Sequence, residues 1–256
     1  MEELSPTPTY DVLGTRVHSV QIPDVVARME RWIAQHEATK FIALCNVHMI
    51  MESRKDDRLR SALAASALTV PDGKPLIWVG RNKGFALTRR VYGPDLFHDF
   101  IAATHRKGYR HFFYGGHAGV PESMIGKLQQ RYPGLQVAGY YSPPFRQLTA
   151  EEDHAAVSMI NETHADVLWV GLGCPKQEVW MHQHRDQLNV PVVLGVGQAF
   201  NIVAGTLPQA PSWMREHGLE WLFRLVREPR RLWKRYLVYN TGFVMHIVLE
   251  AAGFRK

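Results

Sequence analysis

Two polar side chains, Lys176 and Gln177, stand in the loop that follows the most apolar segment of the chain. The segment ADVLWVG (Ala165–Gly171) is typical of a buried central strand, because β-branched and apolar residues follow one another without alternation. The loop LGCPKQE (Leu172–Glu178) then combines glycine, proline, lysine, glutamine and glutamate. In open α/β sheets, ligands bind outside the carboxyl ends of the strands. We therefore expect Lys176 and Gln177 to hold a polar substrate.

Asp72, in TVPDGKP at the end of another predicted strand, is the candidate general base. A carboxylate there would point into the crevice and could take the proton of an attacking hydroxyl group. An Asp-Gly turn or a helix cap is the alternative. Asn46 and His48 follow a further strand in LCNVHM. The Asn46 amide could bind a sugar or cap the next helix, and His48 could be an acid/base group or an ordinary loop histidine.

Four residues in two further motifs could bind phosphate or sugar. Gly115 and Gly116 end a strand in FFYGGHAGVPE, and bare backbone amides at the entrance of a helix suit a diphosphate. In TRRVYGPDLF, Arg90 could hold a phosphate and Asp95 a sugar hydroxyl, unless Asp95 only caps its helix. All four are predicted to bind substrate.

The chain lacks the sequence motifs of several common enzyme classes. Neither GGHAG nor GLGCPK matches the GxGxxG dinucleotide fingerprint, and no GxxxxGK[ST] loop occurs, which disfavours dehydrogenases and P-loop enzymes. His182 and His184 are two residues apart on a predicted helix, which is poor metal geometry. No DxD acid pair is present, so a metal-bound nucleotide sugar is not indicated. We expect no metal and no cofactor.

The elements that must position these residues alternate along the chain. Six segments have the character of parallel strands: 40–45, 67–71, 110–114, 135–140, 166–171 and 191–196. Segments with helical period lie around and between them: 28–36, 47–65, 94–107, 121–132, 150–164 and 176–188. This alternation predicts right-handed βαβ units and an α/β fold with a doubly wound, mainly parallel six-stranded sheet. Residues 10–20 are expected to add a small hairpin.

Size and composition restrict the class of protein further. The 256 residues suffice for one large α/β domain or two small ones, and 46% of them are hydrophobic. The formal charge of +6 fits an anionic substrate, a membrane surface or a nucleic acid. The start, MEELSPTPTYD, lacks the basic and apolar regions of a signal peptide, and no clean apolar run reaches eighteen residues. We expect a cytoplasmic protein with both cysteines reduced.

The composition shifts near Gly205, which divides the chain into a predicted catalytic domain, residues 1–205, and a C-terminal helical appendage, residues 206–256. Between Arg215 and Arg235 seven Lys or Arg face only three Glu, so this segment carries most of the net charge. The basic residues Arg224, Arg227, Arg231 and Lys234 have the spacing of one helix face, although Pro229 should kink that helix or begin a new one. The apolar stretch after Tyr236 is interrupted by polar residues and is typical of an interfacial or partner-packing segment, including a possible homo-oligomer contact.

The ordered set of motifs closely resembles the WecG/TagA/CpsF family of bacterial glycosyltransferases, glycosyltransferase family 26. The resemblance spans residues 10–236 and is carried by LCNVHM, TVPDGKP, RRVYGPDLF, FYGGHAGVPE, VGLGCPKQE and GQAFNIVAGTLPQAPSWMREHGLEWLFRLVREPRRLWKRY. It implies a Rossmann-like fold and an inverting, metal-independent enzyme. Such an enzyme moves a sugar from a UDP-sugar donor to a polyprenyl-diphosphate-linked sugar acceptor. It acts in bacterial surface polysaccharide synthesis, as a peripheral protein on the inner, cytoplasmic face of the plasma membrane.

The resemblance also implies roles for individual residues. The family's proposed base falls on Asp72, its asparagine after the first strand on Asn46, and its PKQE glutamine on Gln177. The appendage arginines thought to meet the UDP diphosphate fall on Arg224, Arg231 and, as a lysine here, Lys234. The chain departs from many members at three positions, with Leu44 in place of Thr, Gln209 in place of Arg, and lysine at 234.

These roles combine into one mechanistic hypothesis. Asp72 deprotonates the acceptor hydroxyl group, which attacks the sugar from the face opposite UDP, while the basic appendage and backbone amides neutralise the departing diphosphate. The appendage also contacts the anionic membrane surface. The alternative is a basic α/β module that binds nucleic acid or membrane without catalysis, since Arg alternates with Trp and Tyr in the appendage. The resemblance favours the enzyme, with no nucleic-acid partner.

Overall fold

The computed structural model describes residues 7–36 and 38–254. Over these residues, one six-stranded parallel sheet has the strand order β4-β3-β8-β7-β5-β6. The strands are β3 (Lys40–Cys45), β4 (Leu68–Pro71), β5 (Arg110–Gly115), β6 (Gln136–Tyr141), β7 (Val167–Gly171) and β8 (Val192–Gly195). All six predicted strands are confirmed, and so is the Rossmann-like α/β class, with a sheet that is entirely parallel.

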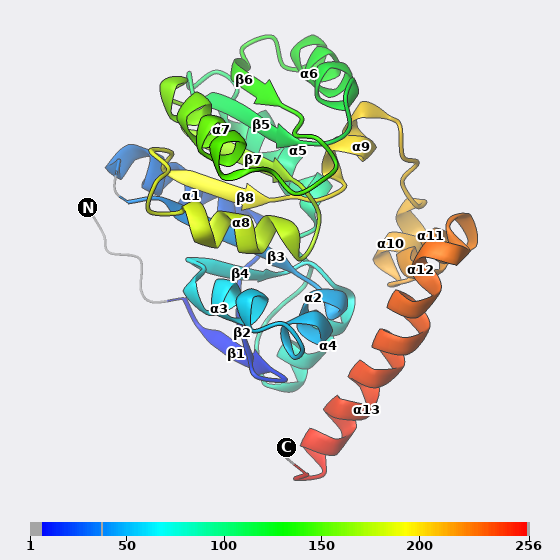
Figure 1. Cartoon of the computed structure of the whole chain (residues 1–256). Coiled ribbons are helices and arrows are strands. Elements are labelled where there is room, and N and C mark those ends of the chain that lie inside the picture. Colours follow the sequence, from blue (N-terminus) through cyan, green and yellow to red (C-terminus); the bar gives the residue numbers. More distant parts are fainter. Residues whose placement is uncertain (1–6, 37, 255–256) are drawn as a thin grey trace.

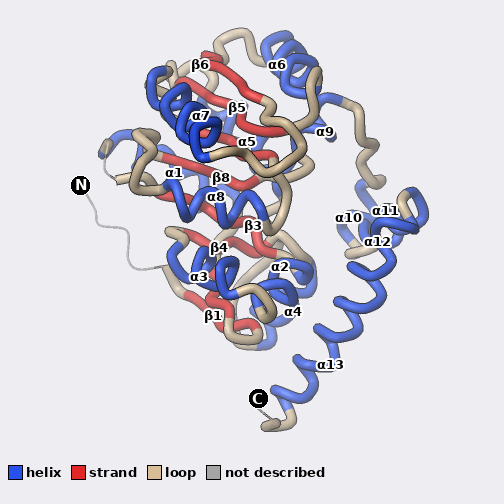
Figure 2. Tube along the Cα trace, viewed as in Figure 1, coloured by secondary structure: helices blue, strands red, loops and turns tan. Residues whose placement is uncertain are grey.

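Helices cover both faces of the sheet, as Figure 1 and Figure 2 show. On one face, the hydrophobic core joins four helices to strand residues such as Leu44 and Trp169. These helices are α1 (Ile22–Gln35), α5 (Gly93–Thr104), α6 (Val120–Arg131) and α9 (Ala199–Ala204). On the other face, α7 (Ala150–Glu162) and α8 (Lys176–His184) pack against residues such as Leu168 and Val170. Successive strand residues therefore enter opposite cores, which explains their unbroken apolar runs.

A third apolar cluster lies below the β4 edge of the sheet in the view of Figure 1. It includes residues of α2 (Val47–Ser53), α3 (Asp57–Ala65) and α4 (Lys74–Asn82), and of the hairpin β1 (Thr9–Val12) and β2 (Thr15–His18). The hairpin was expected within residues 10–20 and is confirmed. Its turn residues Leu13 and Gly14 both have positive φ, the conformation of a tight primed hairpin turn.

Two helix predictions were wrong in their extent, and one helix of the sheet's carboxyl edge was missed. The segment expected as one helix over 47–65 is two helices, because Asp56 begins α3 as its N-cap and accepts the backbone N–H of Arg58 at 2.9 Å. The first helix starts at Ile22, six residues early, where Gln21 and Asp24 form a capping box. The structure also contains α4, which we did not predict, with Pro75 in its first turn.

The C-terminal segment is helical and lies across the carboxyl edge of the sheet and alongside α2 (Figure 1). It consists of α10 (Ser212–Glu216), α11 (Glu220–Arg227), α12 (Pro229–Trp233), a π-helical turn η1 (Lys234–Val238) and α13 (Tyr239–Ala251). Pro229 begins a new helix, the second of the two outcomes expected for it. Among the helices that the structure describes, none is both long and apolar enough to cross a membrane.

Candidate active site

A cavity of about 950 Å³ lies between the carboxyl ends of the strands and the C-terminal helices. Loops after β3, β4, β7 and β8 form one side, and residues from α11 to α13 form the other. Six of the predicted site residues line this cavity: Asn46, Asp72, Arg90, Gln177, Arg224 and Arg231. The cavity therefore brings the candidate base Asp72 together with Arg224 and Arg231, which are about 150 to 160 residues away in the sequence.

The Asp72 carboxylate has an oxygen, Oδ1, that is shielded from solvent and has no hydrogen-bond partner among the described residues. Burial raises the pKa of this carboxyl group to about 6, while the charges of Arg90 and Arg224 oppose the shift. Gly73, not Asp72, is the N-cap residue of α4, so the helix-cap interpretation does not apply. An unpaired carboxylate oxygen inside a cavity has the free lone pairs that a general base needs.

Asn46 has two contacts that serve different purposes. Its Oδ1 accepts the backbone N–H of Met49 at 3.3 Å and so caps α2, as the alternative interpretation held. A hydrogen bond from its side chain to Asp72 favours the ionised carboxylate and limits the rise in the Asp72 pKa. The neighbouring His48 lies stacked on Tyr239, with ring centroids 5.5 Å apart, and burial lowers its pKa to about 3. This imidazole is therefore neutral near pH 7.

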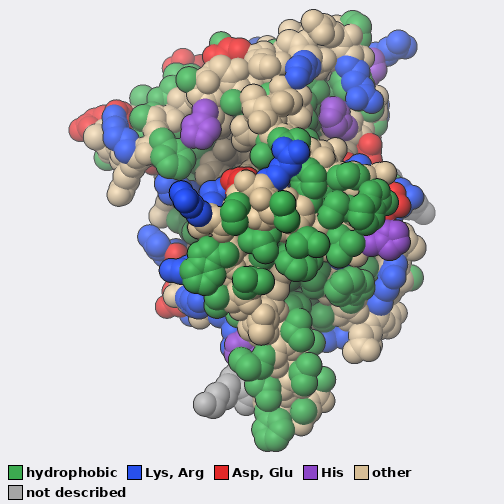
Figure 3. All heavy atoms as spheres, turned by 90° about the vertical axis from the view of Figure 1, so that its right-hand side faces the viewer, with side chains coloured by type: hydrophobic (Ala, Val, Ile, Leu, Met, Phe, Trp, Pro, Cys, Tyr) green, Lys and Arg blue, Asp and Glu red, His purple; other side chains and the backbone are tan. Residues whose placement is uncertain are grey.

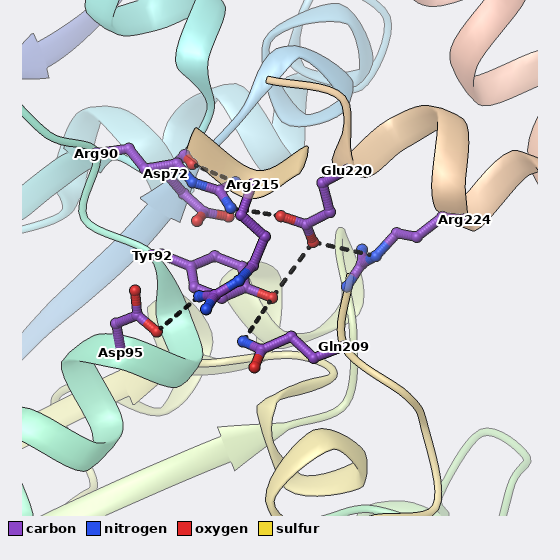
Figure 4. Close-up of polar contacts among 8 residues, drawn as sticks. All are labelled: Asp72, Arg90, Tyr92, Asp95, Gln209, Arg215, Glu220 and Arg224. Carbon is purple, nitrogen blue, oxygen red and sulfur yellow. Dashed lines mark hydrogen bonds and ion pairs between the residues drawn. The ribbon is translucent and has the colours of Figure 1, made fainter. Parts of the chain in front are cut away.

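Glu220 is the buried centre of an ion-pair network that sequence reasoning missed (Figure 4). Arg90 from the sheet side and Arg224 from α11, at 3.2 Å, both pair with it, and the Tyr92 hydroxyl donates to it at 3.3 Å. Although burial disfavours its ionisation, these two arginines hold the pKa of Glu220 below its usual value. In the sequence Glu220 had only reduced the positive charge of the tail.

The same network explains two residues that the sequence had singled out. Gln209, one of the departures from the family pattern, donates to the Tyr92 hydroxyl at 3.5 Å. Arg90 stacks on the Tyr92 ring at 4.1 Å and donates to the Asp72 backbone carbonyl at 3.3 Å. Arg90 is therefore already paired in this structure, and its predicted phosphate contact remains a prediction.

Five predicted site residues lie outside the residues that line the cavity. Asp95, proposed for a sugar hydroxyl, pairs with Arg215 at 3.3 Å (Figure 4). The Nζ of Lys176 lies 5.1 Å from the centre of the Phe145 ring, and the Nζ of Lys234 lies 5.6 Å from the centre of the Trp233 ring. The remaining two residues are Gly115 and Gly116.

The two glycines have a structural explanation at the end of β5. A Cβ atom on Gly115 would approach the backbone of Gly171 to 2.6 Å, so the close packing of β5 and β7 requires glycine here. The Gly116 N–H donates to the Gly171 carbonyl at 3.2 Å. Our description of this amide as bare was wrong, because the parallel pairing continues one residue beyond the strand.

The expected single basic face of the appendage was also wrong. Glu228 separates α11 from α12, so the helix is broken between Arg227 and Arg231. Arg224 and Arg231 line the cavity, together with Arg235, which we had not placed in the site. Arg235 follows Arg231 at the i+4 spacing that would have indicated it. Its Nε has no hydrogen-bond partner among the described residues, and burial lowers its pKa.

Gln177 is buried and joins the two loops that border the cavity. Its Oε1 accepts the backbone N–H groups of Gly173 and Gly197, each at 3.1 Å, and its Nε2 donates to Glu178 at 2.7 Å. Burial raises the pKa of Glu178 to about 7. Gln177 thus fixes the ends of β7 and β8 relative to each other, whatever contact it makes with a substrate.

Replacing Gln177 with leucine should lower the free energy of unfolding by about 1–3 kcal/mol and reduce turnover, because two loop amides lose their shared acceptor. Urea denaturation and a turnover assay measure the two effects. Gln183→Leu, on the exposed side of the same helix, is the matched control and should change neither. Equal stability of the two variants would contradict this role of Gln177.

Within the described parts of the chain, no three His, Cys, Asp or Glu side chains gather in a way that could hold a metal ion. Metal independence stays a prediction for the turnover assay described below. Cys45 and Cys174 are both free thiols, as expected. Burial raises the pKa of the Cys174 thiol, so it lacks the thiolate character of a nucleophile.

Comparison with known proteins identifies relatives over nearly the whole chain. The model of the glycosyl transferase WecG/TagA/CpsF family matches residues 10–256. A protein of Bacillus spizizenii named N-acetylglucosaminyldiphosphoundecaprenol N-acetyl-beta-D-mannosaminyltransferase is 29% identical, covering 88% of this chain and 87% of its own length. Proteins with the same name are 29% identical in Bacillus subtilis strain 168, over 82% of this chain and 79% of the relative, and 26% identical in Staphylococcus aureus strain MW2, over 92% and 89%.

Proposed function

The chain belongs to the WecG/TagA/CpsF family of glycosyltransferases, and on this premise we propose that it transfers a sugar from a UDP-sugar to a polyprenyl-diphosphate-linked sugar. One observation carries the proposal: the Asp72 carboxylate, whose Oδ1 has no hydrogen-bond partner among the described residues, shares its cavity with Arg224, Arg231 and Arg235. A base and a cluster of cations are the two groups that displacement of a diphosphate requires. The relatives are named for an N-acetylglucosaminyl-diphosphoundecaprenol acceptor, and we propose an acceptor of this class here.

The proposed reaction is a single displacement at the anomeric carbon of the donor sugar. Asp72 accepts the proton of the acceptor hydroxyl group, and the hydroxyl oxygen bonds to that carbon. The bond from the carbon to the UDP oxygen breaks on the opposite face, so the configuration inverts and the electron pair leaves with UDP. A folded-state pKa of about 6 leaves Asp72 mostly ionised at pH 7 and yet basic enough to take up the proton.

In this proposal, arginine side chains near the leaving group neutralise its charge, which is the usual role of a divalent ion. Negative charge grows on the diphosphate as UDP departs, and fixed cations in a shielded cavity stabilise such charge strongly. Arg224 already pairs with Glu220, which holds its side chain in place at the cavity wall. Arg231 and Arg235 line the same side of the cavity. We assign the diphosphate of UDP to Arg224 and Arg231, with the charge of Arg235 beside them.

We also propose that the protein binds the inner face of the plasma membrane peripherally. Hydrophobic side chains gather over the face that carries the C-terminal helices, and Lys and Arg residues border them (Figure 3). The exposed residues on these helices include Trp213, Trp233, Leu237, Arg227 and Arg230. Each basic residue near an anionic bilayer contributes ~1 kcal/mol, and exposed aromatic side chains suit the interface. A membrane-bound acceptor would reach the cavity from this side.

A donor panel tests the proposed reaction directly. UDP-sugars are incubated with an N-acetylglucosaminyl-diphosphate acceptor on a short prenyl chain, in the presence of a chelator. We expect one UDP-sugar to give UDP and an extended acceptor in equal amounts, at a rate that added magnesium or manganese does not raise. Strict dependence on either ion would remove the arginines from the proposed role. Oligonucleotide binding with a steep salt dependence, and no turnover of any donor, would favour the nucleic-acid alternative.

A further inference from the structure

The cavity has an apolar arm that the proposed transfer chemistry does not use. Beyond the arginines, it runs between α4 and α13. We call this part the α4–α13 groove, and its apolar lining residues are Trp78, Val79, Phe243, Val244, Ile247 and Val248.

Part of this lining belongs to the protein core and part is open to solvent. Phe243 is buried, and Val79 and Ile247 pack against the same apolar cluster as α2 and the β1–β2 hairpin. Trp78, Val244 and Val248 remain 55%, 59% and 60% exposed. A contiguous exposed apolar surface next to a polar site marks a binding surface more often than it marks ordinary surface.

Helix α13 is held against the body of the protein near both of its ends, so the groove has fixed walls. Near the start, the Tyr239 hydroxyl donates to Glu52, and Lys55 lies 4.5 Å from the centre of the Tyr239 ring. Near the other end, Glu250 pairs at 3.6 Å with Lys83, the residue that directly follows α4. The α13 residues between these attachments extend ~16 Å at the rise of an α-helix.

We infer that the α4–α13 groove binds the first isoprene units of the acceptor's polyprenyl chain, an inference that rests on the proposed function. The two parts of the cavity match the two parts of one amphiphilic molecule. Lys74 and Arg235, which precede the groove residues of α4 and α13 in the chain and line the same cavity, complement the acceptor's diphosphate, while Arg224 and Arg231 remain for the diphosphate of UDP. An acceptor diphosphate at Lys74 and Arg235, with its chain in the groove, leaves the attached sugar free to reach Asp72.

This occupant fits the groove better than a flat lipid surface does. The groove is a part of the active-site cavity with walls on two sides, so a single extended chain can enter it, whereas a bilayer surface meets only the outside of α13. Met245 and Leu249 are exposed but do not line the cavity. The two sides of α13 can therefore be tested separately.

Calorimetric titration with unreactive prenyl diphosphates, without vesicles and below their micelle concentrations, tests the inference. The series is isopentenyl, geranyl, farnesyl and geranylgeranyl diphosphate. We expect the dissociation constant to fall ~10-fold with each isoprene unit that enters the groove, since every unit buries apolar carbon, and to level off when the groove is full. Val244→Asp and Val248→Asp should abolish this dependence on chain length but keep the affinity for isopentenyl diphosphate.

The matched controls are Met245→Asp and Leu249→Asp, which place the same charge on the outer side of the same helix. They should bind the series as the wild type does, and circular dichroism should show all four variants folded. Affinity independent of chain length, or equal losses in the groove variants and the controls, would overturn the inference. So would a dimer in which a second copy fills the groove and excludes the prenyl diphosphates.

Binding and turnover, measured separately, distinguish a failure of the inferred prenyl-binding groove from a failure of the proposed transfer reaction. Chain-length-dependent binding without turnover of any UDP-sugar would leave the groove in place and reject the proposed transfer. Turnover of a UDP-sugar, with binding that does not depend on chain length, would support the proposed transfer and reject the groove as the prenyl site.

Discussion

Substituting asparagine for Asp72 is expected to lower turnover ~10²–10⁴-fold, the range that a positioned general base contributes. Asparagine keeps the size of the side chain but cannot accept the acceptor's proton. The fold should be unchanged, because Asp72 Oδ1 has no hydrogen-bond partner to lose among the described residues. UDP release from a matched donor and acceptor measures the effect. Asp186→Asn, at an exposed aspartate, is the control, and near-normal turnover of the Asp72 variant would reject Asp72 as the base.

The same variant should be more stable than the wild type at neutral pH. Burial raises the folded-state pKa of Asp72 from 3.8 to about 6, so the folded state binds its proton more tightly than the unfolded state does. The stability that Asp72 contributes is therefore complete below pH ~4 and is lost as the pH rises through about 6. A shift of this size corresponds to ~3 kcal/mol. Urea denaturation at low and neutral pH should show the variant gaining stability only at the higher pH.

Changing Glu220 to alanine is expected to detach the C-terminal helices from the sheet domain and to reduce turnover by up to ~10²–10³-fold. Arg90 and Arg224 would then lie buried without their shared partner, and breaking such a pair costs ~3–5 kcal/mol. The cost falls on the contact between the sheet and α11, because Glu220 joins the two. Hydrogen exchange should show lost protection in α10 to α13, with the strands still protected.

Two further variants test the expectation for Glu220, an exposed-acid control and a deletion of the C-terminal helices. Glu216→Ala removes an exposed acid from the neighbouring helix and should leave turnover and protection unchanged. Deletion from Arg215 onward should lose both turnover and liposome binding. If the Glu220 variant kept full activity and full protection, the network would not be what holds the appendage in place.

The strands were predictable because their signal is local. Segments such as Val167–Gly171 are apolar on both faces, and only a covered parallel sheet accommodates such a run. The missed helix α4 follows Pro71, Asp72 and Gly73 and contains a proline and a glycine, so its short amphipathic pattern resembles a loop. The break at Asp56 is readable as a cap only when a helix is already known to begin there.

The candidate site was predictable only in part, for a related reason. Asp72 and Asn46 stand at strand ends, and the sheet topology alone brings those ends together. Glu220 lies 130 residues from its partner Arg90, and nothing in the local sequence distinguishes it from a solvated glutamate. Gly115 and Gly116 carried a real signal, but close strand packing produces the same glycines as a phosphate loop does.

The π-helical turn at Lys234–Val238 sets the rotational phase of the final helix. A π turn holds one residue more than an α turn, which rotates everything after it by ~100°. On an uninterrupted α-helix, Phe243 and Ile247 would point ~100° away from the side that carries Arg231 and Arg235. With the extra residue, all four side chains line one cavity. A relative that lost one residue here would keep its arginines and its apolar residues but would present them in different directions.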